Sequence, residues 1–236
     1  MVSHDRRVRF TVGYREGFAP TRACRVFGED LLYFFYGSQH FEGGGDESLH
    51  ISARAPVVLI FGYDLVSKGK RLFPFDTGAF SDKRYEAWIH HSMTLADFEL
   101  QCPSDAPQRH VSSFFGTNRD YLRLNPQYPP TPYDGEYEVD SLVELLMDPT
   151  RNNADDRRLA IELQLSTSAD ISDATLRALI VPDEIVDAPF MKKFLVEWGS
   201  KVEVIHYPVI MLRQAREYQA LLEERAARKQ EEWGLG

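Results

Sequence analysis

The sequence predicts an α+β protein, with mixed or antiparallel sheets that form a cleft, flanking helices and a long C-terminal helix. Three observations carry this prediction. Apolar and polar residues alternate from Leu159 to Leu165, which is typical of a strand with two different faces. The runs 55–61 and 176–181 are short and almost continuously apolar, as strands buried on both faces are. The segment 208–233 has no internal glycine and starts with a proline, which favours one long helix.

Length and composition indicate one main domain, residues 1–207, followed by the C-terminal helix, residues 208–236. A chain of 236 residues with 43% hydrophobic content can bury a full core. The net charge of −9 argues against general binding to nucleic-acid backbones. The two cysteines, Cys24 and Cys102, are too few for a disulfide framework, so we expect both to be reduced. The sequence contains neither a signal-peptide core nor a run near the roughly 18 apolar residues of a membrane span, and we expect a cytoplasmic protein.

Local patterns predict the remaining elements. Pro74 cannot donate to a strand ladder, which places the strand around it at an edge or an end of the sheet. Apolar residues in the C-terminal helix form a stripe that fades after Leu222, so we expect the helix beyond Glu223 to project into solvent or meet a partner. Further strands are expected at 7–12, 30–37, 70–75 and 201–207, and helices at 83–90, 94–101, 109–124, 139–147 and 188–198.

Glu162 and Gln164 are the best candidates for a functional site. Alternation places both side chains on the less apolar face of the 159–165 strand. A carboxylate inside a sheet needs either a partner or a solvent-filled cleft, because its desolvation is costly. The simpler interpretation is a solvent-exposed strand face, where glutamate and glutamine are ordinary.

Two further segments contain candidate binding residues. Asp76 and Thr77 follow a short strand, where a loop can bring a hydroxyl and backbone N–H groups to a ligand. A structural turn explains the same residues. The aromatic run 33–36 precedes Gly37 and Ser38, and alternation places Tyr33 opposite Tyr36. Core packing accounts for most of this run and leaves one tyrosine for the edge of a site.

Several familiar sites lack their motifs. The seven histidines show no H-x-x-x-H or H-E-x-x-H spacing, which argues against a metal site. The G-x-S-x-G turn of serine hydrolases and the G-x-G-x-x-G turn of dinucleotide-binding domains are both missing. A nuclease with an Asp…Glu-x-Lys motif would need lysine at the position of Gln164.

The order of these segments resembles the ADP-ribosyltransferase fold, in which NAD lies in a cleft between two sheets. That family has an early strand with His or Arg, a middle strand with an aromatic or Ser-Thr-Ser element, and a late strand with a catalytic glutamate. The corresponding segments here are 32–38, 73–78 and 161–164. The early strand has tyrosine instead of His or Arg, and the middle one has Thr77 without Ser-Thr-Ser. Gln164 follows Glu162 instead of preceding it, which points away from arginine as the acceptor.

The resemblance implies an NAD-dependent ADP-ribosyltransferase, a glycosyltransferase that uses NAD as substrate, in the role of a toxin or defence effector. Glu162 would hold a ribose hydroxyl and stabilise the oxocarbenium-like transition state, while Gln164 would orient a nucleic-acid, protein or small-molecule acceptor. Thr77 and a tyrosine would hold the nicotinamide, and N–H groups near Gly37 would meet the diphosphate. The implied NAD-binding residues are Tyr33, Tyr36, Gly37, Ser38, Asp76 and Thr77.

A second interpretation is not enzymatic. An acidic α+β domain with a long terminal helix also suits a protein-interaction module, in which the helix docks a partner protein and Glu162 is merely solvated.

Overall fold

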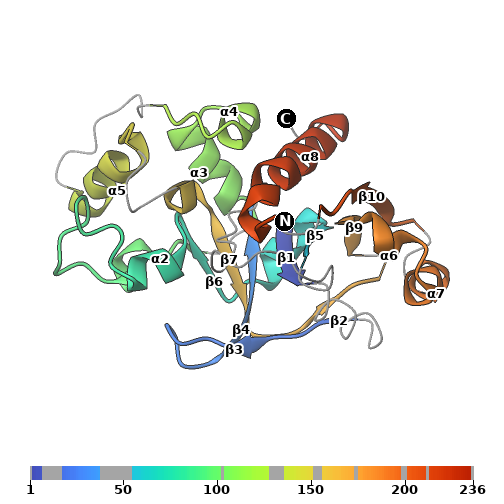
Figure 1. Ribbon diagram of the computed structural model, residues 1–236. Helices are drawn as coiled ribbons and strands as arrows, with labels where there is room; N and C mark the ends of the chain where they lie inside the picture. The colour runs from blue at the N-terminus through green and yellow to red at the C-terminus, as the bar shows by residue number, and fades with distance from the viewer. Residues whose placement is uncertain are drawn as a thin grey trace.

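The computed structural model describes residues 2–6, 18–37, 55–101, 104–127, 136–150, 156–172, 175–197, 201–210 and 213–234. An eight-stranded sheet forms the centre of this α+β fold (Figure 1). Its strands are β1 (Val2–Arg6), β3 (Arg22–Ala23), β4 (Asp30–Phe35), β5 (Pro56–Phe61), β6 (Arg71–Phe73), β7 (Glu162–Leu165), β9 (Leu176–Pro182) and β10 (Glu203–Tyr207). The order is β10-β9-β5-β1-β4-β7-β6, with β3 paired to β4; β9 and β10 are parallel and the other pairs are antiparallel.

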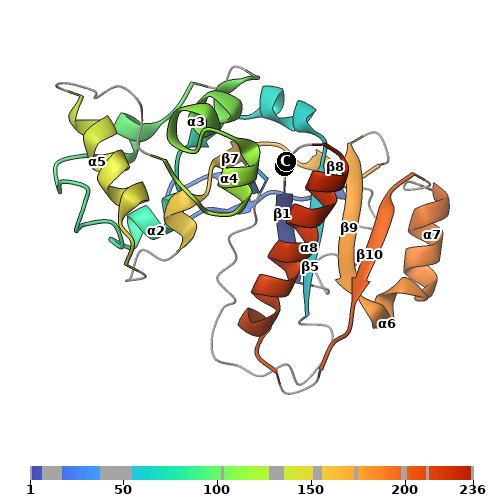
Figure 2. The ribbon, with the colours of Figure 1, turned by 90° about the horizontal axis from the view of Figure 1, so that it is seen from above.

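The remaining elements surround this sheet. β2 (Phe18–Ala19) and β8 (Ala169–Asp170) form a separate two-stranded sheet. The helices are α2 (Thr77–Ser81), α3 (Ala106–Phe114), α4 (Asn118–Leu122), α5 (Tyr137–Met147), α6 (Asp183–Val186), α7 (Pro189–Glu197) and α8 (Gln219–Glu232), with 3-10 turns at Tyr63–Lys68, Leu95–Phe98, Asp156–Leu159 and Ala215–Tyr218. Helices α2 to α5 gather at the β6 end of the sheet, α6 and α7 lie at the β10 end, and α8 runs beside β5, β9 and β10 (Figure 2). None of the helices among the described residues is long and apolar enough to cross a membrane.

Alternation along β5 divides the core between the two faces of the sheet. Val57 and Leu59 belong to the larger apolar cluster, which includes residues of α3, α5 and α7. Val58 and Ile60 point the other way and pack with Leu222 of α8. The predicted continuous apolar strand is therefore confirmed, because both faces of β5 are covered. Burial of this kind contributes about 25 cal/mol per Å² of apolar surface and is the main force that holds the sheet between its helices.

The strand predicted at 159–165 is shorter in the structure. β7 begins at Glu162, and Asp156–Leu159 is a 3-10 turn. The amide of Ile161 donates to the hydroxyl of Tyr121 instead of to a neighbouring strand, which explains the late start. The predicted alternation is confirmed within β7, where Leu163 joins the larger apolar cluster. The expectation of a solvated second face is wrong, because Glu162 and Gln164 are buried.

The C-terminal helix is real but shorter than the predicted 208–233. It begins at Gln219 after a 3-10 turn, and the hydroxyl of Tyr218 holds the backbone of Ile210 by accepting from its N–H and donating to its carbonyl. The expectation that the helix projects into solvent beyond Glu223 is also wrong. Ala226 is 1% exposed and Gln230 is 6% exposed, so the buried face continues along the helix to its last turn.

Three other predicted elements change for identifiable reasons. The helix expected at 83–90 is a series of turns, since Lys83 has a left-handed φ of 61°. The helix expected at 109–124 divides into α3 and α4 around Gly116, whose φ of 78° ends the first helix. Thr94 caps a 3-10 turn instead of a helix through 101. The strand expected at 7–12 lies outside the described residues.

The strands and helices expected at 30–37, 70–75, 139–147, 188–198 and 201–207 are confirmed, each with slightly different ends. β6 is an edge strand of the sheet, as the proline beside it predicted. Cys24 forms no disulfide, as expected, and Cys102 lies outside the described residues.

Candidate functional site

Thr77, Glu162 and Gln164 form one hydrogen-bonded group, which we call the buried polar cluster. The backbone N–H of Thr77 donates to Oε2 of Glu162 at 3.1 Å, and the Thr77 hydroxyl donates to Oε1 at 2.7 Å. The side-chain amide of Gln164 donates to the same Oε1 at 2.7 Å. All three residues are at most 2% exposed. Segments far apart in the sequence therefore meet in one sealed polar contact.

Local structure explains how Thr77 reaches the carboxylate. Asp76 caps α2, and its side chain accepts from the backbone of Ala79 at 2.7 Å. This cap satisfies one free N–H of the first helical turn. The N–H of Thr77, the first residue of α2, is another, and Glu162 accepts it. The Glu162 carboxylate thus acts as a second cap for α2, supplied from a strand 85 residues away in the sequence.

Burial favours the neutral form of Glu162. It raises the pKa of this carboxyl from its ordinary 4.5 to about 8, and the nearby charge of Asp76 raises the pKa further, while the bonds from Gln164 and Thr77 act in the opposite direction. Oε1 of Gln164 is buried and has no partner among the described residues. A protonated Glu162 could donate to that oxygen if the Gln164 amide were rotated.

Tyr33 lies beside the buried polar cluster without joining it. The β4–β7 register pairs Tyr33 with Gln164 and Phe35 with Glu162, so all four side chains lie on one face. The Tyr33 hydroxyl donates to Sγ of Cys24 at 2.7 Å. Burial, followed by the bond to Cys24, raises the pKa of Tyr33 well above its usual range, and the phenol remains neutral.

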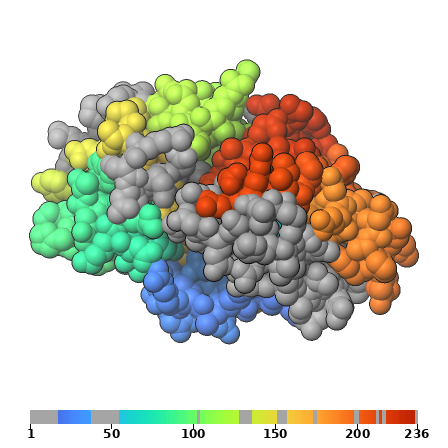
Figure 3. Space-filling model, in the orientation of Figure 1, coloured from blue at the N-terminus to red at the C-terminus, as the bar shows by residue number. Residues whose placement is uncertain are grey.

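A separate cavity of about 620 Å³ opens between the end of the sheet, α4 and α8. We call it the Tyr36 cavity. The surfaces of α4 and α8, light green and red, meet at the top of the molecule in Figure 3. Its size suits a small organic ligand. In the described part of the chain, its lining consists of aromatic, amide and apolar side chains with one charged group: Tyr36, Gly37, Ile60, Phe61, Gly62, Tyr63, Gln108, Asn118, Tyr121, Leu122, Arg177, Gln230 and Trp233.

The aromatic wall of the Tyr36 cavity is held by contacts among its own rings. The ring of Tyr36 lies edge-to-face with that of Tyr63, with 6.0 Å between centroids, and 5.7 Å from that of Tyr121. The Tyr36 hydroxyl donates to Oδ1 of Asn118 at 3.0 Å. Burial raises the pKa of Tyr63 to about 12, so its ring and hydroxyl are neutral near pH 7. The wall is therefore an uncharged aromatic surface in fixed positions.

The last turn of α8 closes one side of the Tyr36 cavity. Gln230 donates from its side-chain amide to the carbonyl of Gly37 and to that of Ala226. Gly37 has a φ of 68°, and a Cβ there would lie 3.1 Å from Leu122 and 3.2 Å from Tyr121. Glycine is therefore required both by the backbone conformation and by the close approach of α4. This contact joins the end of β4 to α4 and α8.

The structure divides the predicted site residues into two groups. Glu162, Gln164, Thr77 and Asp76 lie together at the buried polar cluster, and Tyr33 lies on the same face of the sheet. Tyr36 and Gly37 line the cavity instead. Tyr36 packs against the apolar cluster that contains Phe34, on the opposite face of β4 from Phe35 and Glu162. Contrary to the prediction from the sequence, the structure therefore does not bring Thr77 and Tyr36 together around one ligand. Ser38 lies outside the described residues.

Most residues of the Tyr36 cavity were missed by the sequence analysis, although two had a readable signal. Arg177 is the one charged residue in the apolar run 176–181. Gln230 continues the helical spacing of Leu222 and Ala226, at every fourth residue. Tyr63, Asn118 and Trp233 had no signal, because they come from turns and helix ends whose positions depend on tertiary packing.

Comparison of the chain with family models, curated proteins and solved structures found no match. In the part of the chain that the structure describes, no group of three or more His, Cys, Asp or Glu side chains is arranged to hold a metal ion.

Proposed function

We propose that this protein binds a nucleotide-type ligand in the Tyr36 cavity, and that NAD is the first ligand to test. The observation that supports this proposal is the combination of aromatic rings, amide side chains and one arginine around about 620 Å³ of space. Planar rings bind flat heterocycles by stacking, and amides read their polar edges. NAD supplies two such heterocycles and an anionic diphosphate. Tyr36 and Gly37 belong both to this cavity and to the residues that the family resemblance implies.

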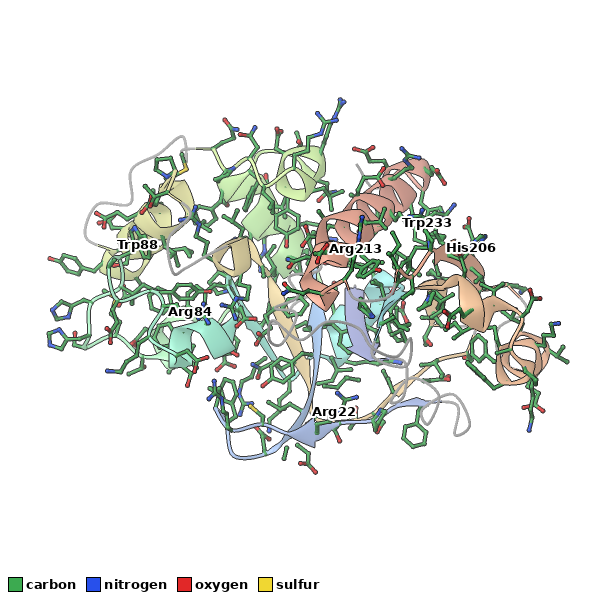
Figure 4. The ribbon with its side chains drawn as sticks, viewed as in Figure 1. Arg22, Arg84, Trp88, His206, Arg213 and Trp233 are labelled. Atoms are coloured by element: carbon green, nitrogen blue, oxygen red, sulfur yellow. The ribbon has the colours of Figure 1, made fainter. Side chains whose placement is uncertain are left out.

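Trp233 offers a direct test, because it lines the Tyr36 cavity. Trp88 lies at the other side of the molecule, near the end of α5 (Figure 4), and Trp198 is outside the described residues. We expect added NAD to change the tryptophan fluorescence of the natural protein and of Trp88→Phe, and not that of Trp233→Phe. Calorimetry on the same three proteins should show NAD binding in each. Absence of both heat and fluorescence change in the natural protein would contradict the proposal.

Transfer of ADP-ribose from NAD is a second candidate function. It is favoured by the direct contact between Thr77 and Glu162, two residues that the resemblance assigns to one site. The chemistry requires an ionised carboxylate that touches the ribose. Glu162 is sealed, is not among the residues that line the Tyr36 cavity, and has a pKa raised to about 8. Binding is therefore better supported than transfer at Glu162.

Nicotinamide release separates the two functions. If the chain only binds NAD, saturating NAD should yield no nicotinamide with nucleic-acid, protein or small-molecule acceptors, or with water. Release that disappears in Glu162→Gln would support the transferase and would require the buried polar cluster to open. The cytoplasm, where we expect this protein to act, supplies NAD to either function.

The interaction-module interpretation rests on α8. The apolar face of this helix packs on Val58 and Ile60 of the protein's own sheet. A partner would therefore have to bind the charged face, which carries Glu224 and Arg228. Nothing about that face specifies a partner, and we favour the ligand-binding function.

A further inference from the structure

The position of Arg177 in β9 results from an irregularity in strand pairing. The β5–β9 register pairs Ile60 with Ala178 and Phe61 with Leu176, so Arg177 is an extra residue between two pairs. A bulge of this kind turns a side chain away from its regular direction. Arg177 is the exposed member of a strand whose other residues are buried, and it lines the Tyr36 cavity.

Gly62 leaves room for the guanidinium group. A Cβ at Gly62 would lie 3.4 Å from Nε and 3.5 Å from Nη2 of Arg177, so the group rests against the bare α-carbon. Asp64, two residues after Gly62, is an acidic residue close to this position, and its Oδ1 would lie 2.4 Å from the same Cβ. Even so, Arg177 forms no ion pair or hydrogen bond among the described residues, whereas other arginines such as Arg71 and Arg228 are paired.

Among the described residues, Arg177 is also the one charged residue that lines the Tyr36 cavity. The neutral hydroxyls there already have partners: that of Tyr36 donates to Asn118, and that of Tyr63 contacts Gln108. An unpaired guanidinium beside an aromatic wall presents several N–H donors in a plane, which suits a phosphate or carboxylate. The cavity thus combines a surface for a flat ring with one cationic group.

We propose that the ligand of the Tyr36 cavity is an aromatic compound that also carries an anionic group, and that Arg177 binds this group. The family resemblance implied that N–H groups around Gly37 bind the diphosphate. In the present proposal Arg177 binds the anionic group instead. The inference rests on the proposed ligand-binding function, and it adds a specificity rule. A nucleoside monophosphate should bind better than the nucleoside, because only the former engages Arg177.

Calorimetry with adenosine, AMP and inorganic phosphate tests this rule. In the natural protein we expect AMP to bind about tenfold or more tightly than adenosine, and phosphate alone to bind weakly. Arg177→Gln should lose about tenfold in AMP affinity and leave adenosine affinity unchanged. The matched control is Arg228→Gln, because Arg228 lies in a different surface depression, between β10 and α8. This control should bind all three probes as the natural protein does.

The outcomes separate the two proposals. If Arg177→Gln binds AMP as tightly as the natural protein, the role of Arg177 is overturned while the cavity function stands. An equal loss of adenosine and AMP affinity would also overturn it, because Arg177 would then support the cavity wall and not the anion. If neither adenosine, AMP nor NAD binds the natural protein, the cavity function and the inference fail together. Circular dichroism spectra of both variants should match that of the natural protein, because both arginines are exposed.

Discussion

The buried polar cluster, between β7 and α2, and the Tyr36 cavity, at the ends of β4, β5 and β9, differ in every respect that matters for function. In the cluster, three donors surround the carboxylate of Glu162, and its members are at most 2% exposed. In the cavity, an aromatic wall and Arg177, which has no ion pair or hydrogen bond within the described ranges, surround about 620 Å³ of space. A polar residue in a strand can therefore act structurally, by binding the first turn of a helix. The cavity forms elsewhere, where the ends of strands and helices meet.

The difference follows from what each region does with its polar groups. Buried polar atoms must be paired, and Glu162 is paired because it caps the first turn of α2. Ionisation of Glu162 costs free energy in the folded protein, because burial raises the pKa of its carboxyl to about 8. In the Tyr36 cavity, Arg177 has no ionic partner in the part of the chain that the structure describes, and its exposure to solvent makes this inexpensive. A ligand can thus gain from Arg177 without breaking any existing contact.

The largest loss of stability is expected for substitutions in α8, which packs on the sheet and also lines the Tyr36 cavity. Ala226→Glu should destabilise the protein by about 4 kcal/mol or prevent folding, because it buries a charge at a position that is 1% exposed. The neighbouring Ala227 is only partly buried, so Ala227→Glu should change stability by no more than about 0.5 kcal/mol. Urea unfolding measures both. Similar stability in the two variants would mean that α8 is not held against the sheet.

Removal of the carboxylate from the buried polar cluster should come next. Glu162→Leu keeps a similar volume but leaves the Thr77 and Gln164 donors without an acceptor, which should cost about 3 kcal/mol. Glu162→Gln keeps an acceptor for these donors and should be at least about 2 kcal/mol more stable than Glu162→Leu at pH 7. The comparison is made by urea unfolding under one buffer. A Leu variant as stable as the natural protein would show that the cluster does not fasten α2.

Glycine substitutions at two sites with the same backbone conformation should separate packing from strain. Gly28 and Gly37 have φ values of 67° and 68°, and a Cβ at Gly28 meets nothing within 4 Å. Gly28→Ala should therefore cost about 1 kcal/mol, the cost of a left-handed residue. Gly37→Ala should cost about 2 kcal/mol, because its Cβ also presses on Leu122 and Tyr121. Equal costs, measured by thermal unfolding, would argue against the close contact of β4 with α4.

The pH dependence of stability tests the protonation state of Glu162. The folded state holds the Glu162 proton more tightly than the unfolded state, with a pKa of about 8 against an ordinary 4.5. Stability from the neutral carboxyl is therefore complete below about pH 4.5 and is lost as the pH rises through 8. We expect Glu162→Gln to gain stability relative to the natural protein between pH 5 and pH 8. A parallel pair of stability–pH curves would contradict the raised pKa.

The sequence predicted the positions of the main strands well. It did not predict which helices cover the two faces of the sheet. Apolar alternation identified β5, β7 and β9, because the period of two belongs to the backbone itself. Thr77, the partner of Glu162, was already among the candidate residues. The burial of Glu162 was not predicted, because it depends on the position of α2 over β7. Arg177 stood out as the one charged residue of the apolar run 176–181, but its place in the cavity depends on a strand bulge, which the apolar pattern does not reveal. The extent of the α8 stripe was underestimated, because alanine and glutamine can be buried on a helix without standing out as apolar.

The most direct test of the central claim compares NAD binding to Trp233→Ala and to Glu162→Gln by calorimetry. Trp233 lines the Tyr36 cavity, whereas Glu162 belongs to the buried polar cluster. If the ligand site is the cavity, Trp233→Ala should lose about tenfold in NAD affinity through lost stacking, and Glu162→Gln should bind NAD as the natural protein does. The reverse result, with affinity lost in the folded Glu162→Gln protein and kept in Trp233→Ala, would place the ligand at the buried polar cluster and contradict this account.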